Sequence, residues 1–191
     1  MSAKNLLIHG GFMESANASP SMSRISVLQL REHWDAVAAL KCGEQIVSIY
    51  PGQMPPWTDI CEQLDWDLHR VAGGYFSEKD YGYCGVYRII ALESDGGLMG
   101  PASLNRLCGR DSTGTLYIGC SRQLHRRLNE FRRGSHGAAA ALRALPGMSL
   151  PPTKLAIALL FTNTCIEFIE RHLIQAYTNT YGDAPPLNYR L

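Results

Sequence analysis

A strand that turns directly into a basic helix constrains the fold of this sequence more than any other feature. Residues 114–128 read GTLYIGCSRQLHRRL. The run Leu-Tyr-Ile is typical of a strand, and the glycine after it interrupts the pattern. Ser121 is a suitable N-cap for an arginine-rich helix over residues 121–133. The sequence therefore predicts a domain that contains both strands and helices.

The elements around this unit follow in a clear order. A strand is predicted over residues 85–92, and two short strands surround the D-S-T-G turn of residues 111–114. After the basic helix come a second helix, a buried strand and a long helix, over residues 135–145, 154–161 and 163–180. This order predicts an α+β fold with a small, mainly antiparallel sheet of three to four strands, flanked by helices.

The first part of the chain has a different character. Residues 1–24 are rich in Ser, Ala, Gly and Asn without periodicity, which predicts a flexible tail. A helix is predicted from Ser26 to the residues before Gly43, then a strand over residues 44–50 and a helix over residues 57–71. The expected parts are a tail (1–24), a mostly helical extension for packing, dimerisation or sequence specificity (25–80), and a C-terminal domain (81–191).

Charge is divided unevenly along the chain. Residues 1–80 carry six Lys/Arg and ten Asp/Glu, a net charge of −4, whereas residues 81–191 carry twelve and seven, a net charge of +5. A basic C-terminal part indicates a polyanionic partner for that part.

Cysteine spacing and hydropathy narrow the class of protein. None of the six cysteines forms a CxxC pair or a zinc-finger spacing, so we expect free thiols in a reducing compartment. No apolar run approaches the roughly 20 residues that span a bilayer, and the first residues do not resemble a secretory signal. We expect a cytoplasmic protein that does not act at a membrane.

The basic helix predicts two classes of arginine. At about 100° per residue, Leu124, Leu128 and Phe131 form one apolar stripe. The opposite side carries Arg122, Arg126 and Arg133, which form either a solvated face or a set of phosphate contacts. Arg127 lies at the border of the stripe, where its guanidinium can hold phosphate oxygens in a fork.

The last helix carries a carboxylate on its apolar face. Ile166, Leu173, Ile174 and Tyr177 define that face, and Glu170 lies in its middle. A carboxylate there needs a cation, a strong hydrogen-bond partner or a proton. Two interpretations remain open: a structural ion pair, for example with Arg127, or a functional site.

Several motifs occur together in the C-terminal part. Gly85-Val86-Tyr87 is followed by Tyr117-Ile118-Gly119, and Arg127 comes ten residues after the second tyrosine. The later segments IERHLIQAY and PPLN supply Glu170 and Asn188. Over residues 85–190 this ordered set resembles the GIY-YIG endonuclease superfamily.

The chain departs from the family pattern in two places. The two tyrosines are 30 positions apart, which indicates an insertion at residues 93–113. Phe131 stands where many members carry His or Tyr. His125 and His136 lie nearby, and we interpret each as a surface histidine.

The resemblance implies a metal-dependent DNA endonuclease. Glu170 would hold Mg²⁺ or Mn²⁺, Arg127 would stabilise the phosphate, Tyr87 would accept the proton of water, Tyr117 would orient the nucleophile or phosphate, and Asn188 would hold the site together. The residues expected to contact DNA are Arg122, Arg126, Arg132, Arg133 and His136.

The setting and the alternatives stay open. A restriction or defence enzyme, a homing endonuclease of a mobile element, a non-specific effector and a repair nuclease all fit. A homodimer would explain cleavage of both strands. The alternative from another class is a catalytically inactive nucleic-acid-binding module.

Overall fold

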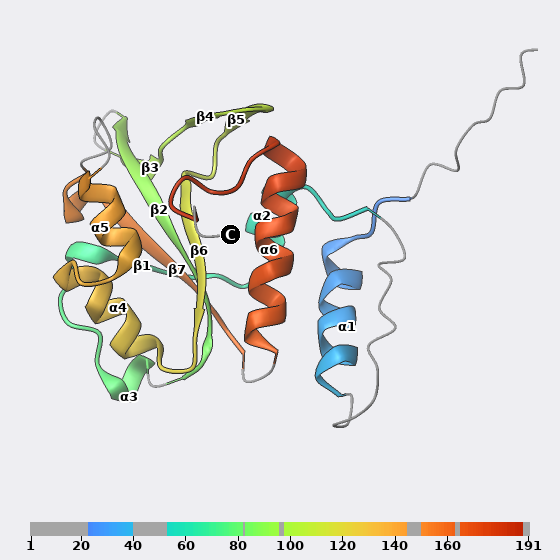
Figure 1. Ribbon diagram of the computed structural model, residues 1–191, viewed down its shortest axis with the longest axis horizontal. Coiled ribbons are helices and arrows are strands. Elements are labelled where there is room, and N and C mark those ends of the chain that lie inside the picture. The colour runs from blue at the N-terminus through green and yellow to red at the C-terminus, as the bar shows by residue number, and fades with distance from the viewer. Residues whose placement is uncertain are drawn as a thin grey trace, which may run out of the picture.

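The computed structural model describes residues 23–39, 53–81, 83–95, 98–144, 150–162 and 165–188 (Figure 1). Its helices are α1 (Val27–Ala38), α2 (Trp57–Gln63), α3 (Glu78–Tyr81), α4 (Leu124–Arg133), α5 (Gly137–Ala144) and α6 (Ile166–Tyr181), with 3₁₀ turns at Val71–Gly73 and Pro152–Lys154. Its strands are β1 (Asp67–Arg70), β2 (Gly85–Asp95), β3 (Leu98–Pro101), β4 (Leu104–Arg106), β5 (Gly109–Asp111), β6 (Thr115–Ser121) and β7 (Leu155–Phe161).

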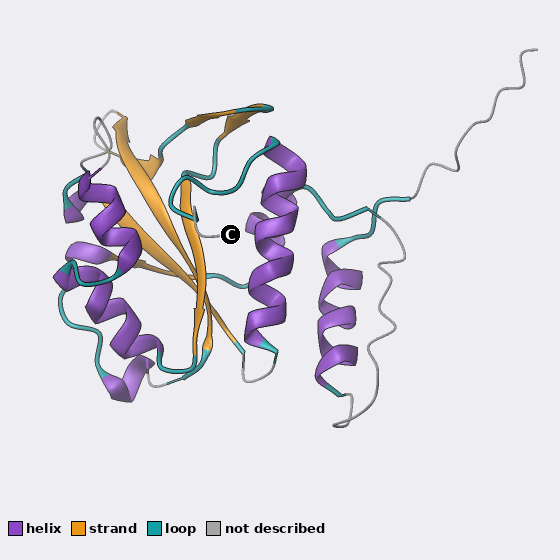
Figure 2. Cartoon of the chain, viewed as in Figure 1, coloured by secondary structure: helices purple, strands orange, loops and turns teal. Residues whose placement is uncertain are grey.

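One curled antiparallel sheet forms the centre of the fold (Figure 2). β2 pairs with β7 on one side; on the other it pairs with β6 along its first half and with β3 along its second half. β1 adds an outer strand beside β7, and β4 pairs with β5 in a separate hairpin. The expected α+β fold with a mainly antiparallel sheet is confirmed, with one strand more than predicted.

Helices cover both faces of the sheet (Figure 1). Because strand side chains alternate between faces, Val86 packs in the cluster that includes α6, whereas Tyr87 packs in the cluster that includes α4 and α5. The predicted apolar stripe of α4 is confirmed, since Leu124, Leu128 and Phe131 are all buried. The two faces thus have separate cores, and β6 runs between them.

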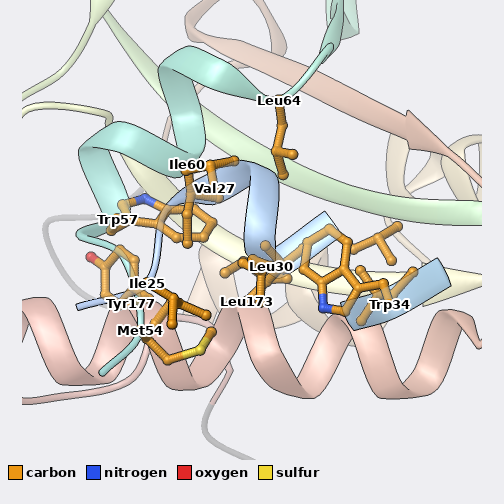
Figure 3. Close-up of a cluster of buried hydrophobic side chains, with 14 of the residues drawn as sticks. Ile25, Val27, Leu30, Trp34, Met54, Trp57, Ile60, Leu64, Leu173 and Tyr177 are labelled. Atoms are coloured by element: carbon orange, nitrogen blue, oxygen red, sulfur yellow. The ribbon is translucent and has the colours of Figure 1, made fainter. Parts of the chain in front are cut away.

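α1 and α2 pack on α6. Leu30 and Trp57 are fully buried against a core that includes Leu173 and Tyr177 (Figure 3). Trp34 Nε1 donates a hydrogen bond of 3.0 Å to His172 Nδ1 on α6. The helix predicted from Ser26 is α1, and Ser26 is its N-cap, because its hydroxyl accepts from the Gln29 backbone N–H.

Two local predictions were wrong. The helix predicted over residues 57–71 ends at Gln63, and Asp67–Arg70 instead pairs with β7. Ser121 does not cap α4: it ends β6, and its hydroxyl accepts from the backbone N–H of Gln123, which is the N-cap. The predicted tail, except its last two residues, and the predicted strand at 44–50 lie outside the described residues.

The insertion at 93–113 is docked on α6. It contains β3 and the β4–β5 hairpin. Arg106 forms an ion pair of 2.7 Å with Asp183, and the backbone N–H of Cys108 donates to Tyr181 O at 2.7 Å. The hairpin is therefore tied to the C-terminal end of α6.

A buried carboxylate connects β5, β6 and α6. Asp111 is fully buried and accepts hydrogen bonds from the Thr113 backbone and hydroxyl, the Thr115 backbone and the Tyr177 hydroxyl, at 2.6–3.1 Å. Four donors satisfy this carboxylate, so it requires no further partner.

In the described part of the chain, no helix has the length and apolarity that a membrane crossing requires.

Candidate active site

The two predicted tyrosines lie side by side on adjacent strands. Tyr87 of β2 is opposite Gly119 of β6, and Tyr117 precedes that glycine by two residues, so both rings are on the α4 face. Their centroids are 5.9 Å apart. The space above Gly119 holds the tyrosine rings. A Cβ there would lie 2.5 Å from Tyr117 Cε1 and 2.9 Å from the Tyr87 hydroxyl.

Tyr87 is the more buried phenol. It is 1% exposed, and its hydroxyl lies 2.9 Å from His136 Nε2. Burial, and then the neighbouring Tyr117, raise the pKa of Tyr87 well above its usual value, against the opposing charge of Arg127. Tyr117 is half-buried, and burial followed by the charge of Glu170 raises its pKa as well.

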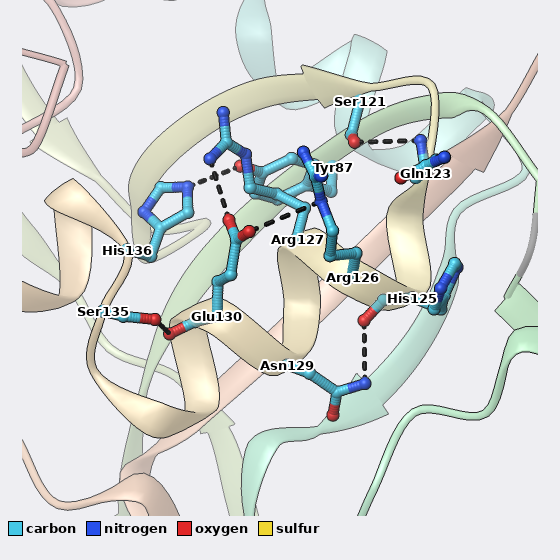
Figure 4. A network of polar contacts seen from close by, with 10 residues as sticks. All are labelled: Tyr87, Ser121, Gln123, His125, Arg126, Arg127, Asn129, Glu130, Ser135 and His136. Carbon is cyan, nitrogen blue, oxygen red and sulfur yellow. Dashed lines mark hydrogen bonds and ion pairs between the residues drawn. The ribbon is translucent and has the colours of Figure 1, made fainter.

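Arg127 extends from α4 over Tyr87 (Figure 4). Its guanidinium donates to Glu130 at 3.0 Å, and Arg126 approaches the same carboxylate at 3.5 Å. The ion pair with Glu170 considered from the sequence is therefore replaced by one with Glu130. The Arg127 side chain is 44% exposed, so its guanidinium can reach an incoming anion.

Glu170 comes from the opposite face of the sheet. It is half-buried on α6, and Oε2 accepts a hydrogen bond of 2.9 Å from the Cys120 thiol of β6. Burial, and then that hydrogen bond, raise the pKa of Cys120, which keeps the thiol protonated as a donor. Glu170 thus has the hydrogen-bond partner that its position demands.

Asn188 fastens the last described residues to β6. Its side-chain amide donates to Ile118 O at 2.7 Å and accepts from Ile118 N at 2.9 Å. Next to it, the Leu187 backbone N–H donates to Leu116 O. Because both ends of the amide are engaged, Asn188 supports the strand that carries Tyr117.

The expected DNA-contacting arginines are exposed on or beside α4. Arg122 pairs with Glu167 at 3.2 Å, and Arg132 lies over the Tyr75 ring at 5.9 Å. Arg126 and Arg133 are also exposed.

His136 does not have the surface position expected from the sequence. It is 5% exposed, and both ring nitrogens lie within hydrogen-bond distance of protein atoms. A phosphate contact through this ring would have to break one of those bonds.

The donor set around Glu170 suits a hydrated hard cation better than a fully coordinated metal. Among the described residues, no three His, Cys, Asp or Glu side chains gather into a metal cluster. Mg²⁺ keeps several waters and is commonly held by one or two carboxylates. One carboxylate at the edge of β6 fits that mode of binding.

A hollow of about 560 Å³ lies away from these residues, between the N-terminal part and α6. Its lining consists of Arg24, Gln53, Met54, Pro56, Gln175, Asn179 and Thr180. These groups include no carboxylate, thiol or imidazole, so we assign no reaction to it.

Two residues of the site, Glu130 and Cys120, and one contact, that of His136 with Tyr87, were missed from the sequence. Glu130 was detectable, since it follows Arg127 by three residues on the same helix. Cys120 was detectable too, because strand alternation places it with Ile118 on the α6 side. The contact of His136 with Tyr87 depends on the left-handed turn at Gly134, which folds α5 back onto the sheet, and no local pattern reveals it.

Comparison of the chain with protein-family models, with curated proteins and with solved structures gives no significant match.

Proposed function

We propose that the chain is a metal-dependent endonuclease of the GIY-YIG type that hydrolyses phosphodiester bonds in DNA. The observation that supports this most is the convergence on β6 of two phenols, a guanidinium and a carboxylate from four separate elements, β2, β6, α4 and α6. A single structural ion pair would require only the guanidinium and the carboxylate, without the two phenols.

Each group has a role in such a reaction. Arg127, held near the phenols by Glu130, would exchange that partner for the non-bridging oxygens of a phosphate as charge builds on them. One phenol would orient the attacking water. The other would take the proton of the water as a phenolate, the form that the charge of Arg127 and of a bound metal ion would favour. Asn188 would keep β6, and with it Tyr117, in place.

Glu170 would hold Mg²⁺ or Mn²⁺. When bound, the ion would supply charge stabilisation at the phosphate and the leaving oxygen. Cys120 donates to Oε2 of Glu170, and it would give up this bond if that oxygen became a ligand of the ion. The thiol thus satisfies the carboxylate as long as no cation is present.

The charge of the α4 surface supports DNA as the substrate. Arg122, Arg126, Arg132 and Arg133 are exposed on or next to the helix that carries Arg127. The ion pairs of Arg122 with Glu167 and of Arg126 with Glu130 are at the surface, and they are weak enough for phosphates to replace the carboxylates. A restriction or defence role, and a homodimer that cuts both strands, are part of the proposal.

One observation favours a second candidate, an inactive nucleic-acid-binding module. Tyr87 is almost fully buried and Glu170 already has a hydrogen-bond partner, which are features of groups that serve only the fold. The same experiment separates the two candidates.

The test is plasmid cleavage. Purified protein is incubated with supercoiled plasmid and with single-stranded DNA in Mg²⁺, Mn²⁺ or EDTA, beside Glu170→Ala and the control Glu167→Ala, which removes an exposed carboxylate from the same helix. We expect metal-dependent cleavage that Glu170→Ala abolishes and Glu167→Ala retains, with DNA binding intact in both. DNA binding without cleavage by the wild-type protein would favour the inactive module.

A further inference from the structure

His136 has its two ring nitrogens in different surroundings. Nδ1 accepts a hydrogen bond of 3.0 Å from the backbone N–H of Ala138, in the first turn of α5. Nε2 lies 2.9 Å from the Tyr87 hydroxyl (Figure 4). Tyr117 and Phe131 contact the ring at centroid distances of 5.5 and 5.8 Å, so the imidazole is fixed in place.

The contact with Ala138 determines the tautomer. A backbone N–H can only donate, so Nδ1 must present a lone pair and the ring proton must be on Nε2. A proton on Nδ1 would put two donors face to face. Burial, and then the charge of Arg127, lower the pKa of His136 to about 4, so the ring is neutral near pH 7.

The tautomer sets the direction of the next hydrogen bond. His136 Nε2–H donates to the Tyr87 oxygen, so the hydroxyl proton of Tyr87 must point elsewhere. The other groups near Tyr87 are Arg127, Glu170 and Tyr117, and the Tyr117 ring centroid is 5.9 Å from that of Tyr87. Burial is the main cause that raises the pKa of both phenols.

We propose that His136 is a positioning residue: by donating to the Tyr87 oxygen, it turns the Tyr87 hydroxyl proton away from the imidazole and towards the neighbouring Tyr117. This inference rests on the proposed nuclease function. In this arrangement Tyr87 is the buried phenol, and the half-buried Tyr117 is the phenol that meets water and substrate. The roles expected for the two tyrosines from the sequence are thereby exchanged. His136 also supplies an imidazole to the site, although Phe131 stands where many members of the family carry His or Tyr.

The first test does not depend on activity. Long-range ¹H–¹⁵N correlation spectra of protein with ¹⁵N-labelled histidine report the tautomer and charge of each ring, and His136→Phe assigns the signal. We expect a neutral Nε2–H imidazole near pH 7. A proton on Nδ1, or a charged ring, would overturn the proposal whether or not the protein cleaves DNA.

The second test uses cleavage kinetics. His136→Phe keeps a ring but removes the donor, and we expect kcat to fall about tenfold or more with KM unchanged, as for loss of a group that acts in the transition state. His136→Gln, whose amide can donate, should recover part of the loss. The control is His69→Phe on β1, a histidine that pairs with Asp67.

The outcomes are distinguishable. A Gln variant no better than the Phe variant would refute the donor role. A wild-type protein that cleaves no DNA would refute the proposed function and with it the catalytic part of this inference, while the spectra would still decide the direction of the bond to Tyr87.

Discussion

Gly119→Ala tests the packing of the two tyrosines directly. The added methyl group would lie 2.5 Å from Tyr117 Cε1, 2.9 Å from Tyr87 Cζ and 2.9 Å from Tyr87 Oη. Carbon atoms in contact are about 3.5–4 Å apart, so at least one ring must retreat by roughly 1 Å. Tyr87 is enclosed by His136 and the core, so Tyr117 is the ring that moves.

The expected cost follows from overpacking. Inserting a methyl group into a packed region destabilises by about 1–3 kcal/mol. In a chain of this size each kcal/mol lowers Tm by about 2–4 °C. Displacing Tyr117 by this distance should reduce cleavage about 100-fold, because misplacement of a reacting group by about 1 Å has an effect of that order.

Urea unfolding and plasmid cleavage measure both effects. Gly100→Ala is the control, since a Cβ there meets no atom within 4 Å and its φ is ordinary. We expect the control to match the wild-type protein in stability and cleavage. If Gly119→Ala unfolded at the wild-type urea concentration and kept full activity, the account of Gly119 as space for the tyrosines would be wrong.

Three further predictions follow from other parts of the structure. Burial, and then the charge of His33, lower the pKa of His172 to about 4, below the usual value of 6.5. As the pH falls, His172 therefore takes up a proton in the unfolded chain before it does so in the folded chain. The contribution of His172 to the free energy of unfolding should be constant above about pH 6.5 and should fall by roughly 2–3 kcal/mol towards pH 4. Urea unfolding at several pH values should show a smaller fall in His172→Gln, which keeps an acceptor for Trp34 but does not titrate. Asp111→Asn turns an amide NH₂ towards buried donors and should lower the free energy of unfolding by about 2–5 kcal/mol. Asp65→Asn, at a surface ion pair, should change it by less than about 0.5 kcal/mol, and equal effects in urea unfolding would refute this account of Asp111. Replacing Arg122, Arg126, Arg132 and Arg133 by Gln should reduce the slope of log K against log salt by about 0.9 for each lost phosphate contact. An unchanged slope in fluorescence anisotropy would show that this face does not bind DNA.

The elements with strong local patterns were predictable from the sequence. β2, β7, α4, α5 and α6 lie within a few residues of their predicted bounds. The two strands are buried on both faces and read as continuous apolar runs, whereas burial of one face imposes the helical period on the three helices. β1 was not predictable, since an outer strand needs little apolar alternation and is fixed by backbone bonds to β7. Its residues also continue the amphipathic pattern of α2.

The candidate site divides in the same way. The positions of Tyr87, Tyr117 and Arg127 follow from strand and helix periodicity, so their common face was predictable. The partners were not: Arg127 contacts Glu130, Glu170 contacts Cys120, and Tyr87 contacts His136. Each of these site residues has several polar groups nearby. Which of them becomes its partner depends on the positions of the side chains in three dimensions.

The attachment of Leu187 and Asn188 to β6 has a consequence for behaviour in solution. Open backbone groups on a strand edge act as a template for another chain and promote aggregation. The Leu187 N–H and the Asn188 amide occupy the backbone groups of Leu116 and Ile118 that would serve as that template. Leu187 and Asn188 therefore cover the edge of β6. A protein shortened by residues 187–191 would self-associate through this edge at concentrations at which the longer chain does not.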